Sequence, residues 1–186
     1  DLYVVSGSIE SQEKEIYQDR LYLNNGKGNF ALSAGSVPET MASGSCVRAA
    51  DYDGDGDLDL FVGGRVVPGG YPTPARSYVL RNENGKFVDA TADVSADLQT
   101  LGIITDAIWT DFNQDNKVDL ILVGEFMPIT FFANEGGKLV RLDNSGINQF
   151  TGWWNSITGG DFDQDGDVDY VAGNLGTNNN YQVKAE

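Results

Sequence analysis

Residues 51–59 read Asp-Tyr-Asp-Gly-Asp-Gly-Asp-Leu-Asp and place five carboxylates in nine positions. Two related stretches follow, Asp-Phe-Asn-Gln-Asp-Asn-Lys-Val-Asp at 111–119 and Asp-Phe-Asp-Gln-Asp-Gly-Asp-Val-Asp at 161–169. In a turning loop, positions 1, 3 and 5 point towards one centre. Two unit charges about 4 Å apart repel by about 4 kcal/mol at an effective dielectric constant of about 20. The spacing therefore predicts a cation in each loop, against the alternative of three solvated acidic turns without metal.

The donor atoms of the loops indicate the kind of cation. Their side-chain donors are carboxylate or amide oxygens, and the chain has no histidine and one cysteine. Oxygen donors without sulfur or imidazole select a hard cation, calcium before magnesium. We therefore expect about three bound Ca²⁺ ions. The expected side-chain ligands are Asp51, Asp53, Asp55 and Asp59; Asp111, Asn113, Asp115 and Asp119; and Asp161, Asp163, Asp165 and Asp169. Position 7 of each loop is expected to contribute its main-chain carbonyl, from Asp57, Lys117 and Asp167.

These loops differ from the EF-hand. An EF-hand loop has twelve residues and ends in a bidentate Glu, whereas position 12 here is Val62, Leu122 or Ala172. An acid at position 9 takes the place of that Glu. Position 6 requires a left-handed backbone, which glycine adopts freely and asparagine tolerates. Because the middle loop has an amide at position 3 and a lysine at position 7, we expect it to bind its cation most weakly.

The acidic loops belong to a larger repeat. Position 9 recurs at spacings of 60 and 50 residues, and Asp1 precedes a similar short strand, so it resembles position 9 of a fourth loop. Residues 21–30, 79–87 and 131–139 each read as two strands joined by a tight turn. One unit is then four antiparallel strands, as in a propeller blade. We expect an all-β fold, a β-propeller fragment of about three blades, with segments 1–40 (partial), 41–92, 100–143 and 152–186 (partial).

Composition excludes several functional classes. The chain has 186 residues, a net charge of -16 and an isoelectric point near 4.1. Such a charge repels phosphate backbones and anionic lipid, which argues against nucleic-acid binding. No apolar run reaches the roughly 18 residues of a membrane span, so we expect no direct membrane insertion. Without histidine, Ser-His-Asp and Cys-His nucleophiles are excluded, and Cys46 is expected to be a buried small hydrophobe.

The loops, each followed by a short apolar strand ending near glycine, resemble FG-GAP/VCBS repeats, the calcium-loop blades also found in integrin α-chain propellers. The Asn-x-x-Gly-Lys hairpins, Gly-Trp-Trp at 152–154 and Gly-Asn-Leu-Gly at 173–176 are similar to segments of exported bacterial VCBS-repeat proteins. Some of those proteins carry a C-terminal ASPIC/UnbV region and are relatives of cartilage acidic protein. The resemblance covers essentially the whole chain and implies a calcium-dependent propeller.

These features favour one function over a second. Three blades alone would leave open sheet edges, so the chain is expected to be a piece of a longer protein, with the remaining blades of the same propeller as partners. The leading interpretation is a calcium-stabilised extracellular binding module, not an enzyme, with a protein or carbohydrate ligand and structural calcium. Calcium loops of this kind suit extracellular calcium concentrations, so we expect export to the periplasm, the outer-membrane surface or the medium. The alternative is the propeller domain of a secreted polysaccharide lyase or hydrolase, although no motif joins its candidate carboxylates, Asp106, Glu125 and Asp143.

The ligand is expected on the rim opposite the acidic loops. The connections that emerge there in a propeller are the long and variable ones, at 6–19, 64–77, 143–154 and from 174 onward. Variable loops on a rigid scaffold are where binding usually resides. Aromatic faces beside polar groups suit sugars or a protein hot spot. The predicted contact residues are Arg65, Tyr71, Trp153, Trp154 and Asn155; in the other interpretation the tryptophans pack between blades.

Overall fold

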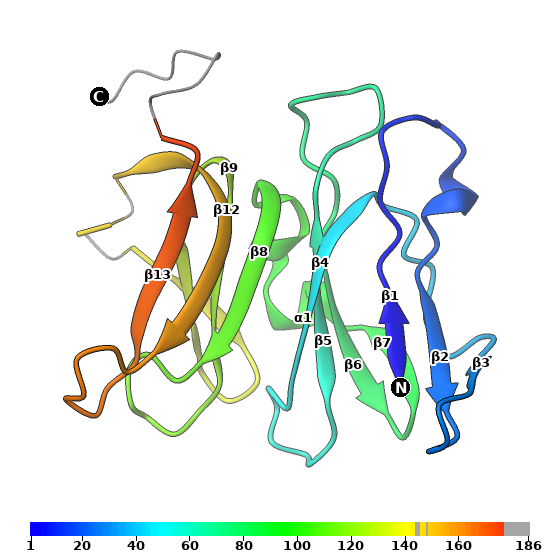
Figure 1. Ribbon diagram of the computed structural model, residues 1–186, viewed down its shortest axis with the longest axis horizontal. Helices are drawn as coiled ribbons and strands as arrows, with labels where there is room; N and C mark the ends of the chain where they lie inside the picture. The colour runs from blue at the N-terminus through cyan, green and yellow to red at the C-terminus, as the bar shows by residue number, and fades with distance from the viewer. Residues whose placement is uncertain (144–145, 148, 177–186) are drawn as a thin grey trace.

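The computed structural model describes residues 1–143, 146–147 and 149–176. Its strands form three antiparallel sheets that stand side by side (Figure 1). The sheets contain three, four and six strands, which confirms the all-β fold class and is consistent with a β-propeller fragment. The strands of the first two sheets are β1 (Leu2–Val4), β2 (Arg20–Asn24) and β3 (Phe30–Leu32), then β4 (Gly44–Ala50), β5 (Asp59–Gly64), β6 (Tyr78–Glu83) and β7 (Lys86–Asp89). Those of the third are β8 (Ile103–Thr110), β9 (Asp119–Pro128), β10 (Thr130–Asn134), β11 (Leu139–Leu142), β12 (Thr151–Gly160) and β13 (Asp169–Asn174).

The second sheet is a meander in the order β4-β5-β6-β7, and β8 to β11 repeat that arrangement in the third sheet. The turn between β6 and β7 shows how the sequence reverses the chain between adjacent strands of this meander. Asn84 and Gly85 both have positive φ, 56° and 89°, which the tight turn of a two-residue hairpin requires. The first strand of each unit begins at Gly44, Ile103 and Thr151.

Strand β9 is long and pairs with three strands. Its first part pairs with β8 on one side and β10 on the other, and its end pairs with β12 at Thr151–Trp153. This last pairing joins β12 and β13 to the third sheet, which the sequence did not predict. The predicted segments 41–92 and 100–143 enclose the two meanders. The division into blades stays a prediction, and residues 177–186 of the last segment lie outside the described residues.

The core lies between the sheets. Phe61 of the second sheet and Leu122 and Phe132 of the third are fully buried in one cluster. Leu21 of the first sheet and Leu80 of the second belong to another. Each fully buried side chain of this kind contributes about 1.5–3 kcal/mol through the hydrophobic effect. The facing sheets therefore stabilise one another.

Polar contacts also cross from sheet to sheet, and Asp106 on β8 is at their centre. The guanidinium of Arg48 on β4 forms an ion pair with Asp106, and its Nε donates to the carbonyl of Ala107 at 2.8 Å. On the other side, the main-chain N–H of Ile157 on β12 donates to the second oxygen of Asp106 at 3.0 Å. The carboxylate is nearly buried, with 7% of the residue exposed. One side chain thus links strands β4, β8 and β12.

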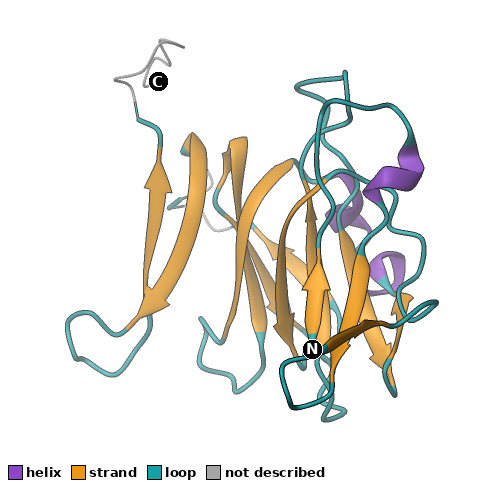
Figure 2. Ribbon diagram, turned by 45° about the vertical axis from the view of Figure 1, so that its right-hand side comes forward, coloured by secondary structure: helices purple, strands orange, loops and turns teal. Residues whose placement is uncertain are grey.

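Helical structure among the described residues is limited to short turns, η1 (Lys14–Tyr17), α1 (Thr91–Val94) and η2 (Ala96–Thr100), drawn purple in Figure 2. No described helix has the length and apolar character needed to span a membrane. Cys46 is half-buried against the core between the second and third sheets, and burial raises the pKa of its thiol.

Candidate functional site

The three acidic stretches form turns at one rim of the sheets (Figures 1 and 2). They connect β4 to β5, β8 to β9 and β12 to β13. The aspartate at position 9 is the first residue of the second strand in each case. Strand pairing begins at that residue, opposite the last residue of the first strand. Paired strands therefore fix both ends of every loop.

The carboxylate at position 1 organises each loop. In the first loop, Asp51 accepts hydrogen bonds from the main-chain N–H groups of residues 54, 55 and 56, at 2.8, 3.1 and 3.0 Å. Asp111 and Asp161 accept the equivalent bonds from positions 5 and 6. The expected left-handed backbone at position 6 is present, with φ of 96°, 65° and 97°. Position 4 is left-handed as well, at Gly54, Gln114 and Gln164. This second left-handed position is hard to predict from the sequence, because two of those three residues are not glycine.

In the first and third loops, the carboxylates of positions 1, 3 and 9 gather closely. One oxygen from each aspartate lies within 4.8 Å of the other two. Three anionic oxygens at this spacing repel one another unless a cation lies among them. All are hard oxygen donors, so these residues fit the expected calcium ion. The residues are Asp51, Asp53 and Asp59 in the first loop and Asp161, Asp163 and Asp169 in the third.

The middle loop has the same backbone but a different charge distribution. Nζ of Lys117 donates to Oδ2 of Asp115 at 2.9 Å. This contact holds the pKa of the Asp115 carboxyl below its usual range. Asn113 stands at position 3, and its side-chain oxygen accepts the main-chain N–H of Asp115 at 2.9 Å. The lysine thus forms an ion pair with a carboxylate that is expected to bind the cation.

The aspartates at position 9 of the first two loops, Asp59 and Asp119, are fully buried. Burial is the main cause that raises the pKa of Asp59, to about 6, and it also raises the pKa of Asp119. The Oδ2 atom of Asp119 is buried with no hydrogen-bond partner among the described residues. A buried carboxylate oxygen without a partner is costly, and a cation in the loop would compensate it. The middle loop therefore also fits a cation.

Hairpin asparagines hold the position-9 aspartates, a role that the sequence analysis missed. The main-chain N–H of Asn82 donates to Asp59 Oδ1 at 2.8 Å, and that of Asn134 donates to Asp119 Oδ1 at 2.7 Å. Their side-chain amides also donate to the carbonyls of the residues before these aspartates. The recurring Asn-x-x-Gly turn is the sequence signal for this role, in addition to the hairpin that it predicts. Asn24 binds Asp1 in the same way, at 2.9 Å, so Asp1 takes the position-9 place in the first sheet.

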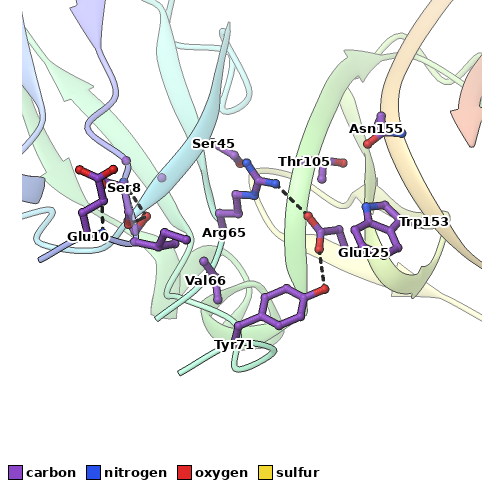
Figure 3. A pocket seen from close by; sticks show the side chains of 14 residues that line it. Ser8, Glu10, Ser45, Arg65, Val66, Tyr71, Thr105, Glu125, Trp153 and Asn155 are labelled. Atoms are coloured by element: carbon purple, nitrogen blue, oxygen red, sulfur yellow. Dashed lines mark hydrogen bonds and ion pairs between the residues drawn. The ribbon is translucent and has the colours of Figure 1, made fainter. Parts of the chain in front are cut away.

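A pocket of about 680 Å³ lies on the opposite rim, where β4, β8 and β12 begin. Four of the five residues predicted to contact a ligand line it: Arg65, Tyr71, Trp153 and Asn155 (Figure 3). The fifth, Trp154, does not. Its ring packs against the buried cluster of Ile121, Val123 and Ile157, and its Nε1 donates to the carbonyl of Met127 at 3.1 Å. Residues 144, 145, 148 and 177–186 of the predicted variable connections lie outside the described residues.

Glu125, a candidate catalytic carboxylate in the enzyme interpretation, lines this pocket. It is 3% exposed, and Nη2 of Arg65 contacts its Oε1 at 3.0 Å. The hydroxyl of Tyr71 donates to its Oε2 at 3.2 Å, as the dashed lines of Figure 3 show. Of the other two carboxylates weighed with it, Asp106 is engaged by Arg48 and Ile157, and Asp143 is exposed just after β11. Neither of them lines this pocket.

The comparison with protein families agrees with the repeated loop geometry. A family model described as FG-GAP-like repeat matches residues 1–62 and 111–172, about two thirds of the chain. The matched ranges contain all three acidic loops. Among curated proteins, no sequence matches the chain. On the strength of the family match and the three loops within it, the chain belongs to the FG-GAP-like repeat family.

Proposed function

We propose that this chain is a calcium-stabilised binding module and forms part of a larger β-propeller in an exported protein. The observation that carries the proposal is the clustering of position-1, position-3 and position-9 carboxylates in the first and third loops. The buried, unpartnered oxygen of Asp119 extends it to the middle loop. The finer assignment, to VCBS-type blades like those of integrin α-chains, is part of the proposal.

Calcium has a structural role in this proposal. Within each loop, position 1 follows the end of one strand and position 9 begins the next. Ligands at both places would hold the two strands together, because a bound cation supplies the positive charge that the clustered carboxylates lack. The hairpin asparagine would extend this support to the third strand of the unit, since it already donates to the position-9 carboxylate.

The outer faces of the described structure support a larger assembly. Tyr52, at position 2 of the first loop, is 4% exposed and stacks on Trp109 of the next sheet with ring centroids 6.2 Å apart. Its equivalent in the third loop, Phe162, is 58% exposed. At the other end, Leu32 of the first sheet is 56% exposed. Exposed apolar faces of this kind mark interaction surfaces, and further blades of the same propeller are the partners that we propose for them.

Export follows from the expected calcium affinity. Loops of this type in extracellular modules work at about 10⁻⁴–10⁻³ M calcium, well above the range of intracellular sensors. A fold that depends on such sites would be stable outside the cell. The ligand of the module is proposed to be a protein or a carbohydrate.

Metal analysis combined with calorimetric titration tests the proposal. The 186-residue chain is dialysed against excess calcium and then titrated after chelation. We expect about three equivalents of calcium and weaker binding of magnesium. The variants Asp51→Asn and Asp161→Asn should each lose one equivalent. Asp93→Asn, a change of an exposed carboxylate outside the loops, is the matched control and should lose none. A stoichiometry of zero or one for the unmodified chain would refute the proposal.

A further inference from the structure

The pocket on the rim opposite the acidic loops is built from irregularities in the strands. In β4, β8 and β12, one residue is inserted in the pairing with the following strand. Gly44 and Cys46, for example, pair with the adjacent residues Gly64 and Gly63. The inserted residues are Ser45, Thr105 and Asn155, and all three line the pocket (Figure 3). β-Bulges re-aim side chains and are over-represented beside active sites. Three strands from the second and third sheets thus deliver one polar side chain each to the same cavity.

A fourth bulge positions the aromatic wall. Met127 of β9 pairs with Gly152 of β12, and Glu125 pairs with Trp153, so Phe126 is the inserted residue. Its φ is 58°, a left-handed backbone that is strained for a bulky side chain. The ring of Phe126 lies 5.1 Å from that of Trp153 and 6.2 Å from that of Tyr71, measured between centroids. Local strain of this kind persists where the surroundings enforce it, and it clusters at functional sites. Here it holds Phe126 against two aromatic residues of the pocket.

The charges of the pocket compensate one another. Arg65 and the buried Glu125 form an ion pair, and Tyr71 bonds the second oxygen of Glu125. The remaining charged group in the lining is Glu10, which is exposed. A cationic ligand would find the buried carboxylate already neutralised, and an anionic ligand would meet a chain of net charge -16. The pocket therefore favours an uncharged ligand.

The remaining donors and acceptors fit a ligand with many hydroxyl groups. Arg65 has five N–H donors, and its side chain is 54% exposed. The side-chain amide of Asn155 is exposed and has no hydrogen-bond partner among the described residues. The hydroxyls of Ser45 and Thr105 donate to main-chain carbonyls of β8 and β12, at 2.7 and 2.8 Å, and retain lone pairs as acceptors. Polar groups that fix orientation beside aromatic faces characterise small-ligand sites, and 680 Å³ is within their usual range.

We infer that this pocket binds a neutral saccharide, whose C–H face packs on Trp153 and Tyr71 and whose hydroxyls bond Arg65 and Asn155. The inference rests on the proposed binding function and specifies its ligand. It places that ligand on the rim opposite the calcium loops, so calcium is not a contact of the sugar.

Calorimetric titration of the calcium-loaded chain with defined oligosaccharides tests the inference. The probes are neutral oligomers of glucose, galactose, mannose and xylose, with uronic-acid oligomers as the charged counterpart. We expect at least one neutral oligomer to bind. Trp153→Ala should weaken binding by about tenfold or more, as for central aromatic contacts, and Trp153→Phe should retain part of the affinity. Asn155→Ala should weaken it several-fold and keep the unmodified melting temperature, because it leaves the Arg65–Glu125 pair intact.

Phe30→Ala, at the exposed start of β3, and Asn29→Ala, in the turn before it, are the matched controls and should bind as the unmodified chain does. The inference is overturned if no neutral oligomer binds at millimolar concentration, if uronic-acid oligomers bind best, or if Trp153→Ala and Asn155→Ala both retain full affinity. A protein that occupies this pocket while every neutral sugar fails would also overturn it. Calcium stoichiometry measured on the same samples separates the two proposals, since three equivalents without sugar binding would refute only this one.

Discussion

The middle acidic loop and the two loops on either side of it share a backbone but differ in charge. In all three, the position-1 carboxylate accepts main-chain N–H groups and position 6 is left-handed. Among the described residues, only the first and third loops bring oxygens of three carboxylates within 4.8 Å of one another. In the middle loop, Lys117 forms an ion pair with Asp115. We therefore expect loop geometry to depend on positions 1 and 6, and the proposed cation affinity to depend on positions 3, 5 and 7. Four experiments separate these two properties.

Chelation has the largest expected effect. A site held at ten times its Kd adds about 1.4 kcal/mol to the free energy of unfolding, so three sites together lower the melting temperature by about 10 °C when they are emptied. The middle site should lose its calcium first as the chelator concentration rises. Differential scanning calorimetry at stepwise EDTA concentrations measures both. An unchanged melting curve in excess EDTA would contradict a structural role for the metal.

Asp119→Asn is expected to have the next largest effect on stability, and the sign of that effect should differ between the calcium-loaded and the calcium-free chain. With calcium, the variant loses the middle site and should be less stable by about 1–3 kcal/mol. Without calcium, it removes a buried carboxylate whose pKa is raised by burial, so it should melt at or above the unmodified chain. The Asn134 N–H still finds an oxygen acceptor in the variant. Destabilisation of equal size with calcium and with EDTA would show that the carboxylate serves the fold and not the cation.

Exchanging the residues at position 7 alters affinity without altering the fold. Lys117→Asp should raise the calcium affinity of the middle site about tenfold, because it removes a cation next to Asp115 and adds an anion. Asp167→Lys should lower that of the third site by a similar factor. Site-resolved calcium titration measures the two constants. Both variants should melt like the unmodified chain in EDTA, and a change seen there would mean that position 7 also supports the loop.

The smallest expected effect concerns the backbone at position 6. Asn116 has φ of 65° where the other loops have glycine. Asn116→Gly removes this strain but increases the entropy of the unfolded chain. We expect a net change within about 0.5 kcal/mol and an unaltered calcium affinity. The reverse change, Gly166→Asn, should cost more, because φ there is 97° and lies further from the left-handed minimum of asparagine. Urea unfolding measures the change in the free energy of unfolding for both variants. A large loss of calcium affinity in Asn116→Gly would refute the separation of loop geometry from charge.

Local patterns predicted the parts of this molecule that local forces determine. The acidic turns, the hairpins and the strand after each position 9 follow from residue spacing and turn chemistry. Propeller topology predicted the rim of the pocket, because it places the long connections opposite the acidic loops. The residues that meet there are Arg65, Tyr71, Trp153 and Asn155. Trp154 differs from Trp153 because neighbouring residues of a strand face opposite sides, so only one of the pair lines the pocket and the other packs into the core.

The long-range features escaped prediction because distant segments create them. The pairing of β12 with the end of β9 joins residues that the repeat pattern assigned to separate units. Glu125 is buried next to Arg65, 60 positions away in the sequence, and no local pattern indicates that pairing. The strained backbone of Phe126 is likewise enforced by the sheet around it, since a bulky residue has no intrinsic preference for φ of 58°.

The contacts of the Asp106 side chain affect how the protein unfolds. It accepts a charged group from β4 and a main-chain amide from β12, so detaching either neighbour leaves a buried anion short of a partner. In a stack of repeats, large coupling between neighbours makes partial unfolding rare. The amide proton of Ile157 should therefore exchange with solvent only when β12 separates from β8. Because the same carboxylate also holds Arg48 of β4, we expect the second and third sheets to behave as a single cooperative folding unit.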